Sequence, residues 1–414
     1  MFAVKFPGYR KRLPVSLVLA ACAVLTTATP AHADFEQCKA GLKAQAKAEG
    51  IDGPTVDHVL DAAQYRPKVI ELDQRQAEFT RSFGNYYQLR VTATRVALGR
   101  ALLAIHMNLL QRVQQQTGVP PHYLVAFWGL ETNFGNVFGD IPVPDSLTTL
   151  ACDPRRSEFF TAELMAALKL IEAGDIGAQQ MRGSWAGAMG HVQFMPSAYL
   201  RYALDGDGDG RRDLWGSIAD VMFSAGNFLQ HLGWQAGLRW GREVILPVRF
   251  NYALANTGRA LPLRDWRALG IKDAFGQLLA ETDITTRLLV PSGHKGPAFV
   301  TYQNFDVIMG WNHSEYYALT VGRLADRIAG AGKLQNTPPD GDLKLSRELV
   351  LQLQQNLNRL GHDTGEPDGI AGPVTRSAVS RYQQSKGVIA DGYLDAAIFD
   401  AVGLDAIGRG VLPE

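Results

Sequence analysis

One glutamate lies on an otherwise apolar helical face, and this position suggests acid–base chemistry. Two prolines suit the first turn of a helix over residues 120–135, and Gly135 suits its C-terminal end. The residues that share one face at helical spacing are Leu124, Phe127, Trp128 and Glu131. Burial raises the pKa of a carboxyl group, and so does the negative end of the helix dipole. A carboxyl group that stays protonated near neutral pH can act as the general acid that breaks a glycosidic bond. The alternative is a partly exposed or ion-paired glutamate.

A glycine-rich segment, residues 181–200, could form the facing wall of a binding site. Three glycines and two alanines within residues 183–190 would let the backbone approach a ligand closely. Trp185 and Phe194 offer flat faces that suit sugar rings, and Gln193 offers an amide. The alternative is a tightly packed loop without a ligand.

Together these segments resemble the lytic transglycosylases of peptidoglycan, specifically the membrane-bound lytic murein transglycosylase B family. The matching runs are residues 128–135 (WGLETNFG), 184–190 (SWAGAMG) and 193–197 (QFMPS). Their order and spacing make the match highly specific, and it extends from about Phe35 to Gly330. The resemblance implies a mainly α (α+β) fold: a lysozyme-like helical catalytic domain with a small antiparallel sheet.

The resemblance also implies a reaction, the non-hydrolytic cleavage of the β-1,4 bond between N-acetylmuramic acid (MurNAc) and N-acetylglucosamine (GlcNAc). Glu131 would protonate the glycosidic oxygen and then accept a proton from the 6-hydroxyl of the muramyl sugar, leaving a 1,6-anhydro end. The acetamido group of that sugar would stabilise C1. The sequence marks no second carboxylate, whereas ordinary glycosidases use two. No cofactor is required for this chemistry.

Several residues would contact the glycan strand, as the resemblance implies. Asn312 would hydrogen-bond the substrate near Glu131, and Trp311 occupies a position that is often tyrosine in relatives. The expected substrate-binding residues are Ser184, Trp185, Gln193, Phe194, Met195, Trp311, Asn312 and Tyr317.

Three other functions stay open at this point. A muramidase would hydrolyse the same bond, but it would need a positioned water and a second carboxylate. A non-catalytic wall-binding protein is possible, although the intact Glu131 argues against it. A scaffold that assembles with cell-wall synthesis or divisome proteins is a third function.

An acidic segment that begins at residue 205 matches the first half of an EF-hand loop. Aspartates occupy positions 1, 3 and 5, and a glycine follows at position 6. Position 12 is Gly216 instead of a bidentate glutamate, and the resemblance suggests closure by a later aspartate. We expect a structural Ca²⁺ here, with a merely acidic turn as the alternative. The predicted ligands are Asp205, Asp207, Asp209, Arg211 through its carbonyl, and Asp220.

The first 33 residues have the features of a signal peptide. A basic stretch precedes the apolar residues 13–25, and Ala31-His32-Ala33 suits cleavage before Asp34. The apolar run is too short to span a bilayer. We therefore expect export to the periplasm of a Gram-negative bacterium. The alternative is a lipid anchor at Cys22, which lies in a lipoprotein-like box.

The charge of the chain argues against one class of function. The sequence has 41 basic and 41 acidic side chains, and the first 33 residues hold four basic and no acidic ones. The remainder is therefore 37 against 41, or −4, which gives no electrostatic support for nucleic-acid binding.

Two cysteines remain after cleavage, Cys38 and Cys152, and they are predicted to form a disulfide, with two separate thiols as the alternative. We expect a monomer.

The chain divides into a large unit and a small one. Residues 34–332 would form the catalytic region, and residues 333–342 form a linker by composition. Residues 343–405 resemble the peptidoglycan-binding module of three helices, because they contain the pattern Asp-Gly-x-x-Gly-Pro-x-Thr at 368–375.

Periodicity indicates the elements that position these residues. Helices are expected over 35–50, 54–63, 90–116, 158–173, 219–232 and from about 311 to 330. A loop is expected over 136–150, and strands over 243–250, 285–290 and 298–301.

Overall fold

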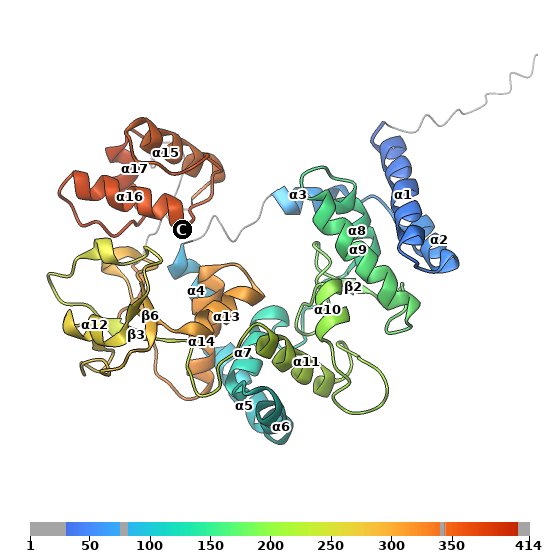
Figure 1. Ribbon diagram of the computed structural model, residues 1–414, viewed down its shortest axis with the longest axis horizontal. Coiled ribbons are helices and arrows are strands. Elements are labelled where there is room, and N and C mark those ends of the chain that lie inside the picture. Colours follow the sequence, from blue (N-terminus) through green and yellow to red (C-terminus); the bar gives the residue numbers. More distant parts are fainter. Residues whose placement is uncertain (1–29, 75–81, 340–342, 344, 405–414) are drawn as a thin grey trace, which may run out of the picture.

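The computed structural model describes residues 30–74, 82–339, 343 and 345–404 (Figure 1). Residues 1–29, with Cys22 and most of the predicted signal peptide, lie outside the described residues, as does part of the predicted linker. Within the described ranges, every helix is too short or too polar to cross a membrane.

The large unit, residues 30–339, is mainly helical. The first helices match the predicted positions closely, and Asp52 caps the second through the backbone N–H of Thr55. The helices are α1 (Pro30–Ala48), α2 (Gly53–Ala62), α3 (Pro67–Gln74), α4 (Phe83–Arg90), α5 (Ala93–Ile105), α6 (Met107–Thr117), α7 (Pro121–Thr132), α8 (Val143–Ala151), α9 (Ser157–Glu172), α10 (Pro196–Tyr202), α11 (Ile218–His231), α12 (Leu263–Ala268), α13 (Gln303–Trp311) and α14 (Glu315–Ile328).

Helix α7 is the centre of this unit. It packs against α5, α6, α11 and α14, and residues 123–129 are all buried. The helix is therefore covered on every side, and the prediction of a single apolar face was too narrow. It ends at Thr132, before the predicted Gly135, because Asn133 already adopts the left-handed backbone conformation.

Two other secondary-structure predictions were wrong. The single helix expected over 90–116 is broken at His106, which ends α5 and begins α6. The loop expected over 136–150 contains α8, because Pro142 and Pro144 lie at positions that begin a helix, where the missing N–H costs nothing.

A five-stranded antiparallel sheet lies beside the helices, with strand order β4-β6-β7-β3-β5. Its strands are β3 (Gly241–Ile245), β4 (Leu261–Pro262), β5 (Lys272–Asp273), β6 (Thr285–Leu289) and β7 (Ala298–Thr301). A second, two-stranded pair joins β1 (Ile141–Pro142) to β2 (Arg182–Gly183), with Ile141 opposite Gly183. This pair attaches the glycine-rich segment to the chain that follows α7.

The C-terminal module contains α15 (Arg347–Arg359), α16 (Pro373–Ser385) and α17 (Ala396–Ala401) around a separate hydrophobic core. Its two Asp-Gly turns are built alike. The Gln354 side chain accepts the N–H of Gly369 (2.8 Å), and the Gln383 side chain accepts the N–H of Gly392 (2.8 Å). The Asp-Gly pattern therefore marks turns held by buried glutamines.

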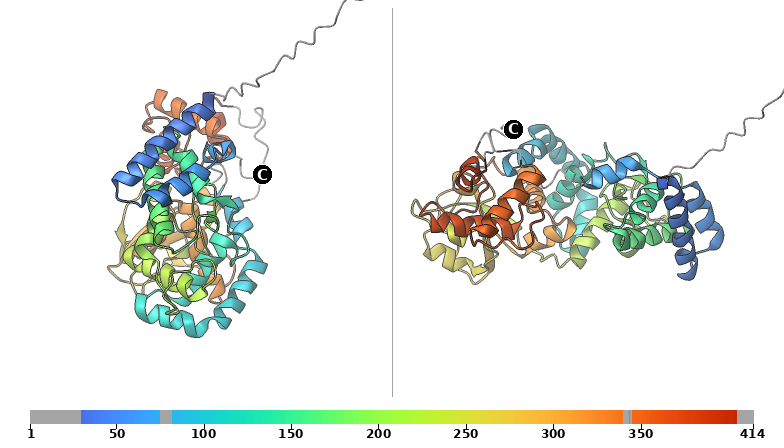
Figure 2. Two further views of the ribbon diagram at one scale, coloured as in Figure 1. Left: turned by 90° about the vertical axis from the view of Figure 1, so that its right-hand side faces the viewer. Right: turned by 90° about the horizontal axis from the view of Figure 1, so that it is seen from above.

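The module lies beside the sheet at one end of the elongated molecule, and α1 and α2 form the other end (Figures 1 and 2). Helix α7 and its neighbours lie between these ends.

Candidate active site

Glu131 lies in the last turn of α7 and is partly exposed, unlike the buried residues 123–129 before it. Its Oε1 accepts a hydrogen bond from Trp311 Nε1 (2.9 Å) and a short one from the Tyr317 hydroxyl. Trp311 is the last residue of α13, and Tyr317 lies in the first turn of α14. Two donors on one oxygen restrict the carboxyl group to one orientation. We call residues 311–317 the α13–α14 corner.

The backbone turns sharply two residues after Glu131, where α7 ends. Asn133 (φ 48°) and Phe134 (φ 60°) both adopt the left-handed conformation, which costs about 1–2 kcal/mol for each non-glycine residue. The Asn133 side chain accepts hydrogen bonds from the Arg95 guanidinium (3.4 Å), and the Phe134 ring packs edge-on against Trp128. Surrounding contacts thus hold a strained turn next to the carboxyl group.

His191 connects α7 to the glycine-rich segment. Trp128 Nε1 donates to His191 Nδ1 (2.8 Å), and the Thr132 hydroxyl donates to the His191 carbonyl (2.8 Å). His191 Nε2 must therefore carry the ring proton, which it donates to the Trp215 carbonyl (3.1 Å). Burial lowers the pKa of His191, which favours this neutral form. The sequence reasoning missed His191, although it lies between two of the matched runs.

The glycine-rich segment supplies partly exposed side chains and holds its own shape. Gln193 has a left-handed backbone (φ 51°), and its amide donates to the Gly190 (3.0 Å) and Phe138 (3.2 Å) carbonyls. The Ser184 hydroxyl accepts the N–H of Ala188 (3.1 Å). Ser184 and Gln193 therefore each have a structural hydrogen bond within the segment, and Gln193 also ties the segment to the chain that follows α7. The partly exposed predicted residues of this segment are Ser184, Trp185, Gln193 and Met195.

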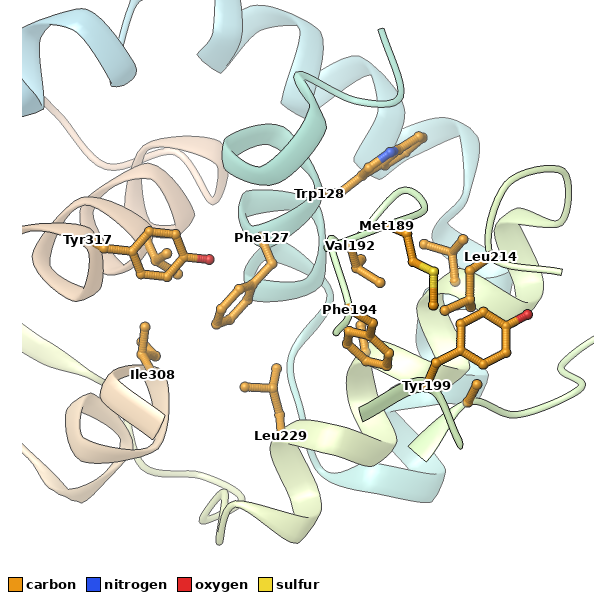
Figure 3. Close-up of a cluster of buried hydrophobic side chains, with 14 of the residues drawn as sticks. Phe127, Trp128, Met189, Val192, Phe194, Tyr199, Leu214, Leu229, Ile308 and Tyr317 are labelled. Carbon is orange, nitrogen blue, oxygen red and sulfur yellow. The ribbon is translucent and has the colours of Figure 1, made fainter. Parts of the chain in front are cut away.

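The prediction that Phe194 stacks on a sugar ring was wrong. Phe194 is only 2% exposed, because backbone hydrogen bonds in both directions with Met189 turn its side chain inward. Its ring centroid lies 5.4 Å from those of both Phe228 and Trp311. Figure 3 shows Phe194 within a cluster of buried hydrophobic side chains. Phe194 therefore packs against Trp311 and, being buried, presents no face to a ligand.

The α13–α14 corner brings together the remaining predicted residues. The Trp311 ring packs on Phe127, with centroids 4.4 Å apart, and remains partly exposed, as does Asn312. Tyr317 is 4% exposed, and its hydroxyl points toward α7 in Figure 3. Tyr317 therefore holds Glu131 and offers little surface to a substrate.

The acidic loop gathers three of its predicted ligands. Carboxylate oxygens of Asp205, Asp207 and Asp209 lie within 4.8 Å of one another, an oxygen donor set that suits Ca²⁺. Hydrogen bonds from the N–H groups of Gly210 and its neighbours lower the pKa of Asp205. The loop thus brings three carboxylate groups together.

Asp220 lies at the base of the acidic loop, apart from that group of three. It is fully buried and accepts the N–H groups of Gly206 and Asp213, both at 2.7 Å. Burial raises its pKa. Asp220 therefore closes the loop through backbone hydrogen bonds, while the Arg211 N–H donates to Asp209 (2.8 Å).

Cys38 and Cys152 form a disulfide, with Cα atoms 5.9 Å apart. It joins α1 to the residue after α8, so a covalent bond attaches the N-terminal helix to the unit.

The chain matches two known family models. Residues 34–326 match the model described as "Transglycosylase SLT domain", and residues 346–402 match "Putative peptidoglycan binding domain". The chain is 31% identical over 297 residues to membrane-bound lytic murein transglycosylase B of Escherichia coli (strain K12), covering 68% of this chain and 79% of the relative.

Solved structures extend the similarity to the whole architecture. SltB3 from Pseudomonas aeruginosa, in complex with NAG-anhNAM-pentapeptide, superposes with a TM-score of 0.85 at 43% identity, covering 89% of this chain and 99% of SltB3. Slt35 from Escherichia coli, in complex with calcium, superposes with a TM-score of 0.62 at 28% identity, covering 72% of this chain and 92% of Slt35. These similarities confirm the expected fold class, a lysozyme-like helical domain with a small sheet and a C-terminal helical module. The chain therefore belongs to the family of SLT-domain lytic transglycosylases.

Proposed function

We propose that this enzyme cleaves the MurNAc-β-1,4-GlcNAc bond of peptidoglycan without water and leaves 1,6-anhydro-MurNAc ends, with Glu131 as acid and then base. The observation that carries this proposal is the position of Glu131, at the end of the central helix and held by Trp311 and Tyr317. The similar SltB3 was solved with an anhydro-sugar peptide, the kind of product that this reaction would leave.

The proposed reaction uses one carboxyl group twice. Glu131 donates its proton to the glycosidic oxygen, and the C1–O bond breaks with its electron pair on the leaving GlcNAc oxygen. The acetamido carbonyl of the muramyl sugar stabilises C1. The Glu131 carboxylate then accepts the proton of the 6-hydroxyl while O6 bonds to C1. Glu131 ends protonated, and no water is consumed.

The partly exposed residues beside Glu131 are the proposed substrate contacts. Trp311 and Asn312 lie on the α13–α14 corner, and the glycine-rich segment supplies the others. Trp185 offers an aromatic face, which suits a sugar ring. The proposed contacts are Ser184, Trp185, Gln193, Met195, Trp311 and Asn312.

We also propose that the acidic loop holds a structural Ca²⁺ and that the chemistry needs no cofactor. The ion would neutralise the clustered carboxylates of Asp205, Asp207 and Asp209 and order the chain before α11. Helix α11 carries Phe228, whose ring lies 5.1 Å from that of Trp311, so ordering this helix would support the site. The calcium complex of the similar Slt35 supports this proposal.

The proposed site of action is the periplasm. The signal-like residues 1–33 and the likeness to wall-acting relatives support this location. The proposed layout is a signal peptide (1–33), a catalytic region (34–332), a linker (333–342) and a peptidoglycan-binding module (343–405).

Mass spectrometry of muropeptides released from purified sacculi tests the reaction. The intact enzyme should release products one water lighter than hydrolysis gives and resistant to borohydride. Glu131→Gln should release none, whereas Glu281→Gln, an exposed glutamate of the same region, should match the intact enzyme. Reducing ends would indicate a muramidase, and sacculus binding without release would indicate a wall-binding protein.

A further inference from the structure

The C-terminal module contacts the corner that holds Glu131. Arg376 of α16 donates from Nη1 to Glu315 Oε1 (2.7 Å) and from Nη2 to the Tyr316 hydroxyl (2.9 Å). Its guanidinium carbon also lies 5.1 Å from the centroid of the Tyr316 ring. Glu315 and Tyr316 directly precede Tyr317 in the chain.

This ion pair is shielded from water. The Arg376 and Glu315 side chains are only 14% and 22% exposed, whereas those of the surface pair Arg264–Asp265 are 53% and 47% exposed. A shielded guanidinium that bonds two different acceptors has a well-defined position, and losing its partner is costly. Arg376 therefore fixes the module against the first turn of α14.

A second contact prevents the module from pivoting about Arg376. The Asp391 side chain, 4% exposed, accepts the N–H of His294 (2.9 Å) and lies 2.6 Å from His294 Nδ1. The Asp391 carbonyl accepts from the Asn256 amide (3.1 Å), and Gln383 of the module holds the other carboxylate oxygen. Two contacts at separate places give the module one orientation.

The same corner is fixed on its other side. The Tyr316 ring packs on Phe83 and Tyr86 of α4, with centroids 5.6 and 6.3 Å away. The Ser314 hydroxyl caps α14 by accepting the N–H of Tyr317 (3.3 Å). Trp311 and Tyr317, which donate hydrogen bonds to Glu131, are six positions apart in the sequence. The residues that Arg376 contacts thus lie between these two donors in the chain.

We propose that the module is a positioning element for catalysis as well as a wall-binding domain. Arg376 fixes the α13–α14 corner, and the corner in turn holds Trp311 and Tyr317 on Glu131. This inference rests on the proposed function of Glu131. It assigns Arg376 the role of a positioning residue, acting through Glu315 and Tyr316.

The test uses the full-length enzyme and a short, soluble NAG-NAM-peptide fragment as substrate. Arg376→Ala should lower kcat roughly tenfold, the factor that 1.4 kcal/mol of lost positioning corresponds to, and change KM less than about twofold. Arg376→Lys should restore part of kcat, because lysine keeps the charge but not the two-point contact. Arg381→Ala is the matched control, since this exposed arginine of α16 donates to the Asp363 carbonyl within the module itself.

Glu315→Gln provides a second test if Arg376→Ala unfolds, as judged by thermal denaturation. It weakens the same contact from the other side. If both single variants fold, the double variant Arg376→Ala/Glu315→Gln should be no slower than the slower single one. A raised KM with unchanged kcat, or unchanged kcat in both folded variants, would overturn the inference.

The Glu131→Gln variant separates the two proposals. If it keeps full activity, the proposed function fails. If it is inactive while Arg376→Ala turns over normally, only the positioning role of the module fails.

Discussion

Removing the Tyr317 hydroxyl should slow the enzyme without disturbing its fold. In Tyr317→Phe the ring stays in place, because it is 4% exposed and packs near Phe127. The lost hydrogen bond to Glu131 belongs to the class worth about 1.5–3 kcal/mol, since its acceptor can be charged. Trp311 still holds Oε1 at 2.9 Å, so we expect the lower part of that range. About 1.5–2 kcal/mol corresponds to a decrease in kcat of roughly 10–30-fold.

The assay measures kcat and KM on a soluble NAG-NAM-peptide fragment. Tyr302→Phe is the matched control, because the buried Tyr302 hydroxyl has no hydrogen-bond partner in the part of the chain that the structure describes. Its loss should leave both kcat and stability close to those of the intact enzyme. Equal kcat values for the Tyr317 and Tyr302 variants would refute the idea that the hydroxyl positions Glu131.

Three further predictions concern stability, measured by urea or thermal unfolding. Burial lowers the pKa of His122 from 6.5 to about 4. As the pH falls from 7 to 4.5, His122 therefore becomes protonated in the unfolded state before it does so in the folded state. The free energy of unfolding should decrease by roughly 2 kcal/mol over this range. His122→Gln should flatten that pH dependence, and an unchanged slope would contradict the assignment. Millimolar Ca²⁺ should raise the Tm of the intact protein but not of Asp207→Asn; no effect on the intact protein would count against the site. Gly322→Ala should cost about 1–3 kcal/mol, because its Cβ would lie 2.2 Å from the buried Trp240 ring, whereas Gly332→Ala meets open space and should be neutral. Equal stability of the two alanine variants would show that the packing at Trp240 can relax.

Local patterns in the sequence were sufficient for most of the elements and for the family. The spacing of Leu124, Phe127 and Trp128 predicted α7, and the runs around Glu131 and Gly187 predicted the enzyme class. The Asp-Gly turns of the C-terminal module were visible because turn chemistry depends on neighbouring residues. Such features could be predicted because their causes lie within a few residues of one another.

Some local predictions failed because the same sequence pattern is compatible with more than one structure. The apolar pattern continues through His106, so the break between α5 and α6 was not visible. Pro142 and Pro144 suggested a loop, although prolines equally suit the start of a helix. An aromatic residue beside glycines suggested a sugar contact at Phe194, but only packing decides which face of a chain is buried.

The surroundings of Glu131 were decided by the tertiary structure. Its two donors lie 180 and 186 residues away in the sequence, and Arg376 contacts their corner from a different domain. His191 bridges α7 and the glycine-rich segment from 63 residues beyond Trp128. Residue types and spacing determine which helices form and which carboxyl group can react. They do not determine which distant donors reach that group, because hydrogen bonds form between whichever atoms the packed elements bring within about 3 Å.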